Sequence, residues 1–356
     1  DLSTRVPKRH SIDGPGHPRQ TGGVILSLVA AFLTSQTSSA PSPETPAPEV
    51  PESRSQTVVT ASRAERKLED VVVATEVITR EQIDATGARD LGQLLQQQPG
   101  VELVYTFRGV GLRLQGLDPE YVLVLVDGER VSGRVGTTLD LGRFSLDTVE
   151  RVEIVKGPSA ALYGADAMGG VVNLITRRVQ QPLELGARGM FGTLLEADVR
   201  GSAGTKQGPL EVRLSGNFRR RDPYDWRPED AATSGAGLSR HDAELSLAYD
   251  AHERTRVWLR GGYGRRDENA VDLNPSGAVL DRRQRQEQVD LSLGTRHQFV
   301  DGPALLVRGH FGLFREQLLQ DQRGSRALDD YSQNITRLFE GLVQGDQRLG
   351  AHALTG

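Results

Sequence analysis

Hydrophobic and polar side chains alternate along the second half of the chain, beyond residue 180. In residues 211–219, Val212, Leu214, Gly216 and Phe218 lie on one face of an extended chain, and charged or polar residues lie on the other. The same period of two recurs in 195–201, 243–249, 257–263, 289–293 and 305–313. This pattern predicts about eight strands with one apolar face each, which fits a soluble sandwich or a membrane barrel.

The connections between these strands favour the barrel. Short connections lie near residues 203–209, 250–254 and 300–303, and long polar ones lie near 220–239, 266–286 and 315–333. Short turns at one end and long loops at the other are typical of outer-membrane barrels, whereas a sandwich has no reason to keep its long loops together. The first long loop carries Tyr224 and Trp226. These two side chains are either ligand contacts or simply solvated.

The first half of the chain shows a mixed α/β pattern instead. Thr79 and Gln82 have the spacing of a capping box at the start of a helix, and a second short helix is predicted over residues 90–97. The apolar run 121–126 ends in an Asp127-Gly128 turn. Residues 150–178 contain two further β runs, separated by a Gly-Pro turn and a Gly-Gly break.

The N-terminal residues have the pattern of an export signal followed by a tether. Basic residues precede an apolar run at 24–33, and small residues end at Ala40, which predicts a signal peptide region at 1–40; a buried core helix is the alternative. Residues 41–56 are rich in Pro, Glu and Ser and predict an extended linker. The β-prone segment 57–63 comes next, either as a docking segment or as the first strand of the following domain.

Composition excludes several classes of protein. The chain has 356 residues, no Cys and a net charge of -4, and its mean hydropathy is -0.41. No run of hydrophobic membrane helices, disulfide framework or thiolate metal site is therefore expected. The interspersed 43 basic and 47 acidic residues give little electrostatic support for nucleic-acid binding.

The sequence contains none of the enzyme motifs that we sought. The sequence contains no zincin, P-loop or nucleophile-elbow motif, and its seven histidines lack metal-ligand spacing. We therefore expect no catalytic residue, no metal and no cofactor.

Several segments together resemble the plug domain of TonB-dependent outer-membrane receptors. They are the Leu-Leu…Pro-Gly-Val element at 94–101, the Gly-Leu-Asp-Pro-Glu-Tyr-Val-Leu-Val-Leu-Val-Asp-Gly element at 116–128, and the stretch 150–178. The resemblance implies a plug domain at 62–178 and the N-terminal part of a barrel at 179–356. It marks as plug-motif residues Gly116, Asp127, Gly128, Arg151, Glu153, Gly157, Pro158, Tyr163, Gly164, Gly169, Gly170 and Asn173.

The resemblance also assigns a TonB box, the segment that binds the periplasmic partner TonB, to residues 57–61. Its residues are Thr57, Val58, Val59, Thr60 and Ala61. Such a segment can add as a strand to the sheet edge of a partner. The candidate ligand contacts are Arg108 together with the loop residues Tyr224 and Trp226.

One departure from the family pattern concerns how the plug is held. In the family, plug arginines near this point can pair with wall carboxylates, but this chain has Gln115 before Gly116. Gln115 cannot form an ion pair, and Arg108, Arg113 and Arg151 are the candidates to replace it.

Geometry predicts a wall larger than this chain supplies. Eight tilted strands close into a cylinder roughly 16 Å across, whereas a plug of about 120 residues has a diameter of roughly 35 Å. About 22 strands would enclose it, as in the family. We therefore expect about 8 of 22 strands here, a fragment of a longer receptor, and an unpaired edge on the last strand.

The resemblance implies TonB-dependent active import through the outer membrane of a Gram-negative-type bacterium. A ferric siderophore is the first candidate ligand and cobalamin is the alternative; the expected partners are TonB, the extracellular ligand and outer-membrane lipid, without nucleic acid. Two other classes stay open: a passive porin or adhesin-like barrel, and a periplasmic enzyme or binding protein. A TonB-box deletion separates the first from an importer, and membrane fractionation separates the second.

Overall fold

The computed structural model describes residues 57–58, 66–67, 74–106, 109–157, 163–300, 302–349 and 352–355. The predicted signal region, the linker, Arg108 and Pro158 lie outside these residues, as does the end of the predicted TonB box, Val59 to Ala61. Two short strands, β1 (Thr57–Val58) and β2 (Arg66–Lys67), pair antiparallel and form a sheet of their own.

An α+β unit, called the plug below, occupies residues 74–178. Its elements are β3 (Thr75–Thr79), α1 (Arg80–Thr86), α2 (Leu91–Leu95), β4 (Val101–Thr106), β5 (Gly109–Leu114), η2 (Pro119–Tyr121), β6 (Val122–Val126), β7 (Glu129–Arg130), η3 (Leu141–Arg143), β8 (Val149–Lys156), η4 (Ala165–Ala167) and β9 (Gly170–Thr176). Five strands form a sheet in the order β3-β8-β9-β6-β7, in which only β6 and β9 are parallel; β4 and β5 form a separate hairpin.

Local sequence signals explain the plug helices. The predicted capping box of α1 is present, because the Thr79 hydroxyl accepts from the Gln82 N–H and the Gln82 side chain accepts from the Thr79 N–H. Helix α1 ends at Gly87 in the left-handed region, at φ 65°. Asp90 caps α2 through the Gln93 N–H, and α2 is shorter than the predicted 90–97.

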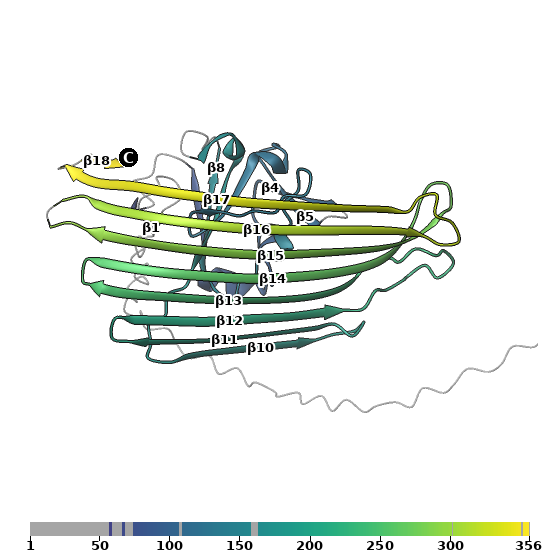
Figure 1. Ribbon diagram of the computed structural model, residues 1–356, viewed down its shortest axis with the longest axis horizontal. Coiled ribbons are helices and arrows are strands. Elements are labelled where there is room, and N and C mark those ends of the chain that lie inside the picture. Colours follow the sequence, from purple (N-terminus) through teal and green to yellow (C-terminus); the bar gives the residue numbers. More distant parts are fainter. Residues whose placement is uncertain are drawn as a thin grey trace, which may run out of the picture. The chain divides into compact units, whose positions relative to one another are not determined.

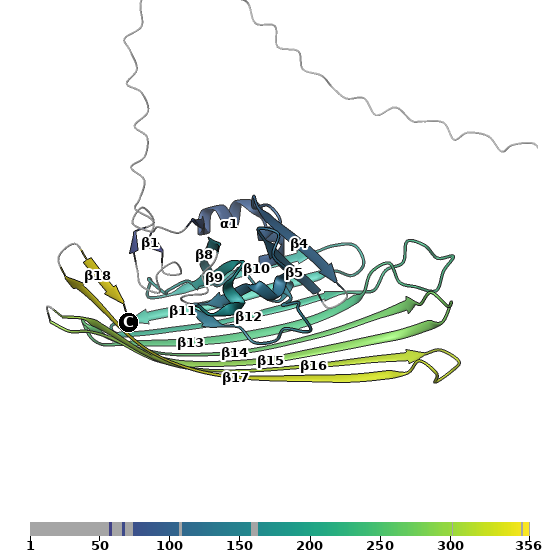
Figure 2. The ribbon, with the colours of Figure 1, turned by 90° about the horizontal axis from the view of Figure 1, so that it is seen from above.

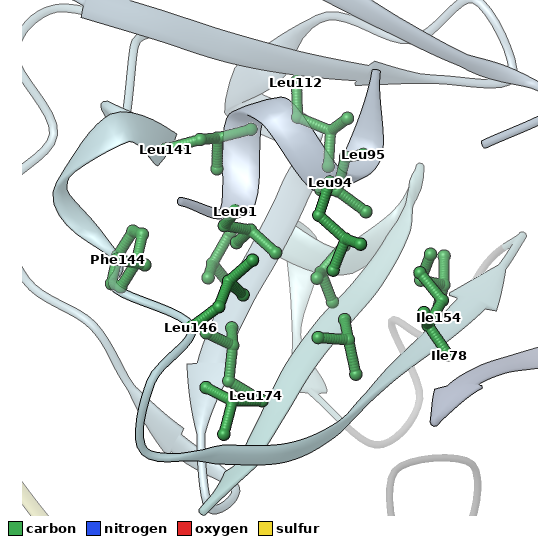
Figure 3. Close-up of a cluster of buried hydrophobic side chains, with 14 of the residues drawn as sticks. Ile78, Leu91, Leu94, Leu95, Leu112, Leu141, Phe144, Leu146, Ile154 and Leu174 are labelled. Atoms are coloured by element: carbon green, nitrogen blue, oxygen red, sulfur yellow. The ribbon is translucent and has the colours of Figure 1, made fainter. Parts of the chain in front are cut away.

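The plug core fills the space between these helices and the sheet. Figure 3 shows Leu91, Leu94 and Leu95 of α2 in one cluster with Leu146 and Leu174, and each of the five is almost fully buried. Burial of such side chains contributes roughly 1.5–3 kcal/mol each. This core fixes the position of β6 and of the turn that follows it.

Nine antiparallel strands, called the wall below, follow the plug in chain order (Figure 1). They are β10 (Glu184–Phe191), β11 (Ala197–Gln207), β12 (Leu210–Arg221), β13 (Gly237–His252), β14 (Thr255–Leu273), β15 (Val279–Gln298), β16 (Ala304–Gln322), β17 (Asp330–Leu349) and β18 (His352–Thr355). The sheet is open: within the described residues β10 and β18 each have one neighbour, as predicted for the last strand. No described helix is long and apolar enough to cross a membrane.

Two of the predicted long loops are wrong. Residues 266–286 and 315–333 are mostly strand, and only 274–278 and 323–329 connect β14 to β15 and β16 to β17. These strands have 19 or 20 residues, against about 9–11 for a tilted strand that crosses a bilayer. The ends of these strands near the loops carry polar residues on both faces. The alternation is therefore lost there, and the sequence pattern predicted a loop. The connection 222–236 is long, as expected.

Candidate functional site

The turn between β6 and β7 brings together three of the predicted plug-motif residues, Asp127, Gly128 and Asn173. Asp127 and Gly128 both have positive φ, 51° and 77°. The Asp127 carboxylate accepts from the Thr176 N–H at 2.9 Å and from its hydroxyl at 2.7 Å, and the Asn173 side-chain oxygen accepts from the Gly128 N–H at 3.0 Å. Asn173 is fully buried. Asp127, Gly128 and Asn173 therefore form one unit that fixes the turn against β9.

Wall arginines hold this turn from the other side. Arg260 on β14 donates to the carboxylates of Asp127 and Glu129. Arg308 on β16 donates to the carbonyl oxygens of Asp127 and Gly128, at 3.0 and 2.9 Å. Glu129 also accepts from the Ser292 hydroxyl of β15. Three adjacent wall strands thus converge on one plug turn, on the wall face that carries the plug in Figure 2.

Further arginines repeat this arrangement along the plug. Arg200 on β11 lies 2.8 Å from Asp147, and Arg266 on β14 pairs with Asp140. The Arg240 guanidinium of β13 donates to the carbonyl oxygens of Gly142 and Arg143. The wall therefore contacts the plug mainly through guanidinium groups, which suit carboxylate and carbonyl acceptors.

The arginines lie on the wall and the carboxylates on the plug, which is the reverse of the expected pairing of plug arginines with wall carboxylates. Gln115 is exposed, Arg113 pairs with Glu102 and Asp118, and Arg151 pairs with Glu153; all of these residues belong to the plug. The candidates Arg113 and Arg151 therefore do not replace the missing arginine at the wall. One contact keeps the expected direction: plug Arg89 lies 2.6 Å from Glu196, in the β10–β11 connection.

Burial sets the electrostatics of the plug surface at this interface. Burial lowers the pKa of Arg143 to about 10, which leaves the group charged at neutral pH. Its guanidinium donates to the carbonyl oxygens of Ser132 and Gly133 and lies 5.1 Å from the ring centroid of wall residue Phe314. Burial also raises the pKa of Asp90, 3.7 Å from wall Arg219.

The other predicted motif residues shape the plug itself. Gly170 has φ 141°, and an added Cβ there would lie 2.4 Å from the Val155 carbonyl oxygen, so only glycine fits. The Gly169 N–H donates to the Tyr121 carbonyl oxygen at 2.8 Å. Buried Tyr163 presents its carbonyl oxygen to Arg130. Three further glycines, Gly116, Gly157 and Gly164, also have positive φ.

The predicted ligand contacts lie apart from the plug contacts. Tyr224 and Trp226 belong to the 222–236 connection, with ring centroids 5.2 Å apart, and Trp226 is 77% exposed. A hydroxyl–carboxylate contact between Ser234 and Asp225 supports their loop. The pair is open to solvent at Trp226, and Arg108 lies outside the described residues.

A cavity of about 380 Å³ separates part of the plug from the wall. Plug residues Asp147 and Thr176 line one side. The other side includes a row of neighbouring wall positions with mostly small side chains: Gly186, Ser202, Ser215, Glu244, Gly262 and Asp290. Small residues leave this space unfilled. The described residues contain no cluster of three or more potential metal ligands.

Comparison with known proteins agrees with this architecture. Residues 67–171 match the model of the TonB-dependent Receptor Plug Domain. Residues 67–171 therefore carry the plug domain of the TonB-dependent receptor family, and the comparisons support a TonB-dependent receptor. This family comprises receptors and transporters rather than enzymes.

Relatives and solved structures support the assignment of the receptor. It is 29% identical over 248 residues to the vitamin B12 transporter BtuB of Vibrio cholerae, an alignment that covers 68% of this chain and 40% of the relative. A mutant of the Pseudomonas aeruginosa ferric enterobactin receptor PfeA matches with a TM-score of 0.65 and 21% identity, over 84% of this chain and 49% of that one. The Acinetobacter baumannii siderophore receptor PiuA matches with a TM-score of 0.60 and 18% identity, over 79% and 43%. These similarities show a plug followed by part of a barrel, and the receptor chain spans less than half of each.

The sequence missed the residues that join plug and wall. Glu129 and its partners Arg260 and Arg308 were not singled out, although the alternation already placed Arg260 on the face opposite Leu259. A period of two shows which residues share a face. It does not show which of many inward arginines meets which distant carboxylate.

Proposed function

We propose that the receptor imports a scarce ligand across the outer membrane, with a ferric siderophore as the first candidate. The observation that carries the proposal is the buried arginine–carboxylate contact of wall strands β14 to β16 with the plug turn at Asp127 to Glu129. A plug held in this way blocks the path beside it, so passage requires work on the plug. The outer membrane has no ion gradient of its own, so the energy must come from a partner.

TonB is the partner we propose, and residues 57–61 are its docking segment. The described part of this segment, β1, forms only a two-residue ladder with β2 and is not a strand of the plug sheet. Main-chain hydrogen bonds of a short strand can be exchanged for those of a partner's sheet edge. This separation from the plug sheet supports the docking role over the role of a first plug strand.

The ligand class rests on similar proteins and on the exposed aromatic pair. PfeA and PiuA are named as receptors for siderophores, and BtuB is named as a vitamin B12 transporter. Cobalamin is therefore the second candidate, favoured by the 29% identity to BtuB. We propose that Tyr224 and Trp226 contact the ligand through their rings.

Uptake by cells that lack other receptors tests this proposal. Deletion of residues 57–61 should abolish energised uptake of the cognate ligand, whereas ligand binding at the cell surface should persist. Deletion of five linker residues, 41–45, is the matched control and should leave both unchanged. Uptake that survives the deletion of 57–61 would indicate a passive pore.

Ligand identity and location need separate measurements. Cells should be supplied in parallel with ferric siderophores and with cobalamin, and Trp226→Ala should weaken binding of the true ligand. Loss of one stacking aromatic side chain is expected to cost about 0.5–1.5 kcal/mol beyond its buried area. Recovery of the receptor in the soluble periplasmic fraction would contradict the proposed outer-membrane location.

A further inference from the structure

Six arginines project from the wall on the face opposite the plug. Strand register places them on the same face as the apolar row Leu214, Leu245, Gly261, Leu291, Phe311 and Phe339. The loop side of this row is the side toward the connections 222–236, 274–278 and 323–329. All six arginines lie on it: Arg220, Arg265, Arg283, Arg285, Arg315 and Arg337. They are called the outer arginine surface below.

The charge of the outward face differs on the turn side of this row, which is the side toward the short connections 208–209, 253–254 and 299–303. Of the outward-facing residues of β11 to β17 described there, none is Lys or Arg; they include Val212, Leu247, Val257, Thr295 and Val343. The inner face carries arginines along its whole length, among them Arg256 and Arg266. Outward positive charge is therefore confined to one edge of the apolar rows, the edge that Figure 1 shows toward the β14–β15 and β16–β17 hairpin loops.

The outer arginine surface is hollowed. A cavity of about 750 Å³ is lined by Arg220, Arg283 and Arg285 together with Phe218 and Tyr331. Its volume falls within the range of about 300–1,000 Å³ that small-molecule sites occupy. Aromatic side chains beside cations suit the boundary between an apolar and an aqueous layer.

The charges of this surface are only partly neutralised. Asp267 contacts both Arg265 and Arg285 at 2.7 Å. Arg220 lies 3.2 Å from Asp222, and Arg315 lies 3.7 Å from Glu287. Arg283 forms no ion pair with the described residues. Both Arg283 and Arg285 are exposed. Exposed ion pairs contribute little to stability, so a stronger anion can displace Asp267 at small cost.

We propose that the outer arginine surface binds the phosphate groups of a phosphorylated lipid in the membrane leaflet on the loop side. This inference rests on the proposed outer-membrane location. The apolar row would contact the acyl chains, and the six arginines follow one to four outward positions further along the same strands, on the headgroup side. Guanidinium groups match phosphate oxygens with paired hydrogen bonds. A lipid is favoured over a protein partner because the cationic and apolar surfaces are continuous.

Binding of lipid A with two phosphates to the full chain in detergent micelles tests the proposal. Each arginine lost near an anionic headgroup should weaken binding roughly fivefold. We expect about a fivefold loss for Arg283→Gln and about 25-fold for Arg220→Gln with Arg283→Gln. The matched control is Arg254→Gln, an exposed arginine in the β13–β14 turn, which should not change affinity.

A variant that is expected to raise the affinity for lipid separates lipid binding from a general loss of structure. Asp267→Asn releases Arg265 and Arg285 from their carboxylate, so affinity for the same lipid should rise. Unchanged affinity in the double arginine variant, or equal binding of dephosphorylated lipid A, would overturn the proposal. Inorganic phosphate is the third arm: displacement of the lipid by millimolar phosphate would indicate a site for the free anion instead.

Failure of this inference is distinguishable from failure of the proposed function. A receptor that fractionates with the outer membrane and imports its ligand, yet binds lipid A equally in all variants, contradicts only the lipid site. A receptor that is recovered soluble contradicts the proposed location, and with it the lipid site.

Discussion

Arg260 on wall strand β14 donates a hydrogen bond to Glu129 on plug strand β7, 131 positions earlier in the chain. The Glu129 side chain is 3% exposed and that of Arg260 is 16% exposed. Arg308 and His310 of β16 also lie within 4 Å of Glu129, at 3.6 and 3.4 Å. One plug carboxylate therefore faces several wall groups in a site with little water.

Removal of this carboxylate should loosen the plug. Glu129→Ala leaves Arg260 and Arg308 buried with fewer counter-charges, and breaking a buried ion pair costs about 3–5 kcal/mol. We expect the free energy of unfolding in urea, monitored by hydrogen exchange of plug amides, to fall by about 3 kcal/mol. The loss should lie at the lower end of that range because Asp127 still pairs with Arg260. The control Glu102→Ala removes the more exposed partner of Arg113 and should cost at most about 1 kcal/mol. Equal effects of the two variants would contradict a special role for Glu129.

A side chain at Gly170 should disrupt the plug sheet. Gly170→Ala combines a contact of 2.4 Å between Cβ and the Val155 carbonyl oxygen with a φ of 141°. Overpacking and backbone strain cost about 1–3 kcal/mol each. The control Gly208→Ala also has positive φ, 56°, but no atom within 4 Å, and should cost about 1–2 kcal/mol. Denaturant midpoints of the two variants give the comparison, and similar midpoints would argue against the close contact.

Plug stability should fall at low pH through Asp84. Its pKa is lowered by the hydrogen bonds from Arg80, which contacts it at 2.6 Å and 3.0 Å. A carboxyl with a lowered folded-state pKa stabilises above its unfolded pKa, near 3.8, and loses that contribution as pH falls through the folded pKa. Because the Asp84 side chain is half exposed, about 0.3–0.5 kcal/mol is at stake. Thermal unfolding at pH 5 and pH 3 should show a smaller decrease for Asp84→Asn than for the wild type.

The control for this pH effect is Glu229→Gln, which removes an exposed loop carboxylate without an ion pair among the described residues. Its decrease in unfolding temperature between pH 5 and pH 3 should match that of the wild type. A decrease as small as that of Asp84→Asn would mean that the Arg80 contact is not responsible.

A bulky side chain in the plug–wall cavity should slow import. Gly262 lines this cavity, and an added Cβ would meet no atom within 4 Å, so a larger side chain can fill the space without a clash at its root. Under the proposed function, Gly262→Phe should reduce uptake of the cognate ligand while surface binding persists. The neighbouring Gly261 faces outward, and Gly261→Phe is the matched control that should leave uptake unchanged. Normal uptake by Gly262→Phe would place the ligand path elsewhere.

Much of the plug could be predicted because its signals are local. The capping box at Thr79 and Gln82 and the end of β6 at the Asp127-Gly128 turn each act within a few residues. The wall strands followed from alternation for the same reason. The hairpins β14–β15 and β16–β17 were cut short because polar residues on both faces hide the period of two.

The sequence by itself determined which residues of the wall share a face, because a side-chain period of two needs no information from the rest of the fold. It also showed the plug motifs, and it showed that Gln115 stands where the family pattern has an arginine. Only the tertiary structure decided that wall arginines hold plug carboxylates, since Arg260 and Glu129 meet where two different sheets pack together. It also decided, through strand register, that the six outward arginines gather along one edge of the apolar rows, because register relates positions on different strands that no local pattern connects.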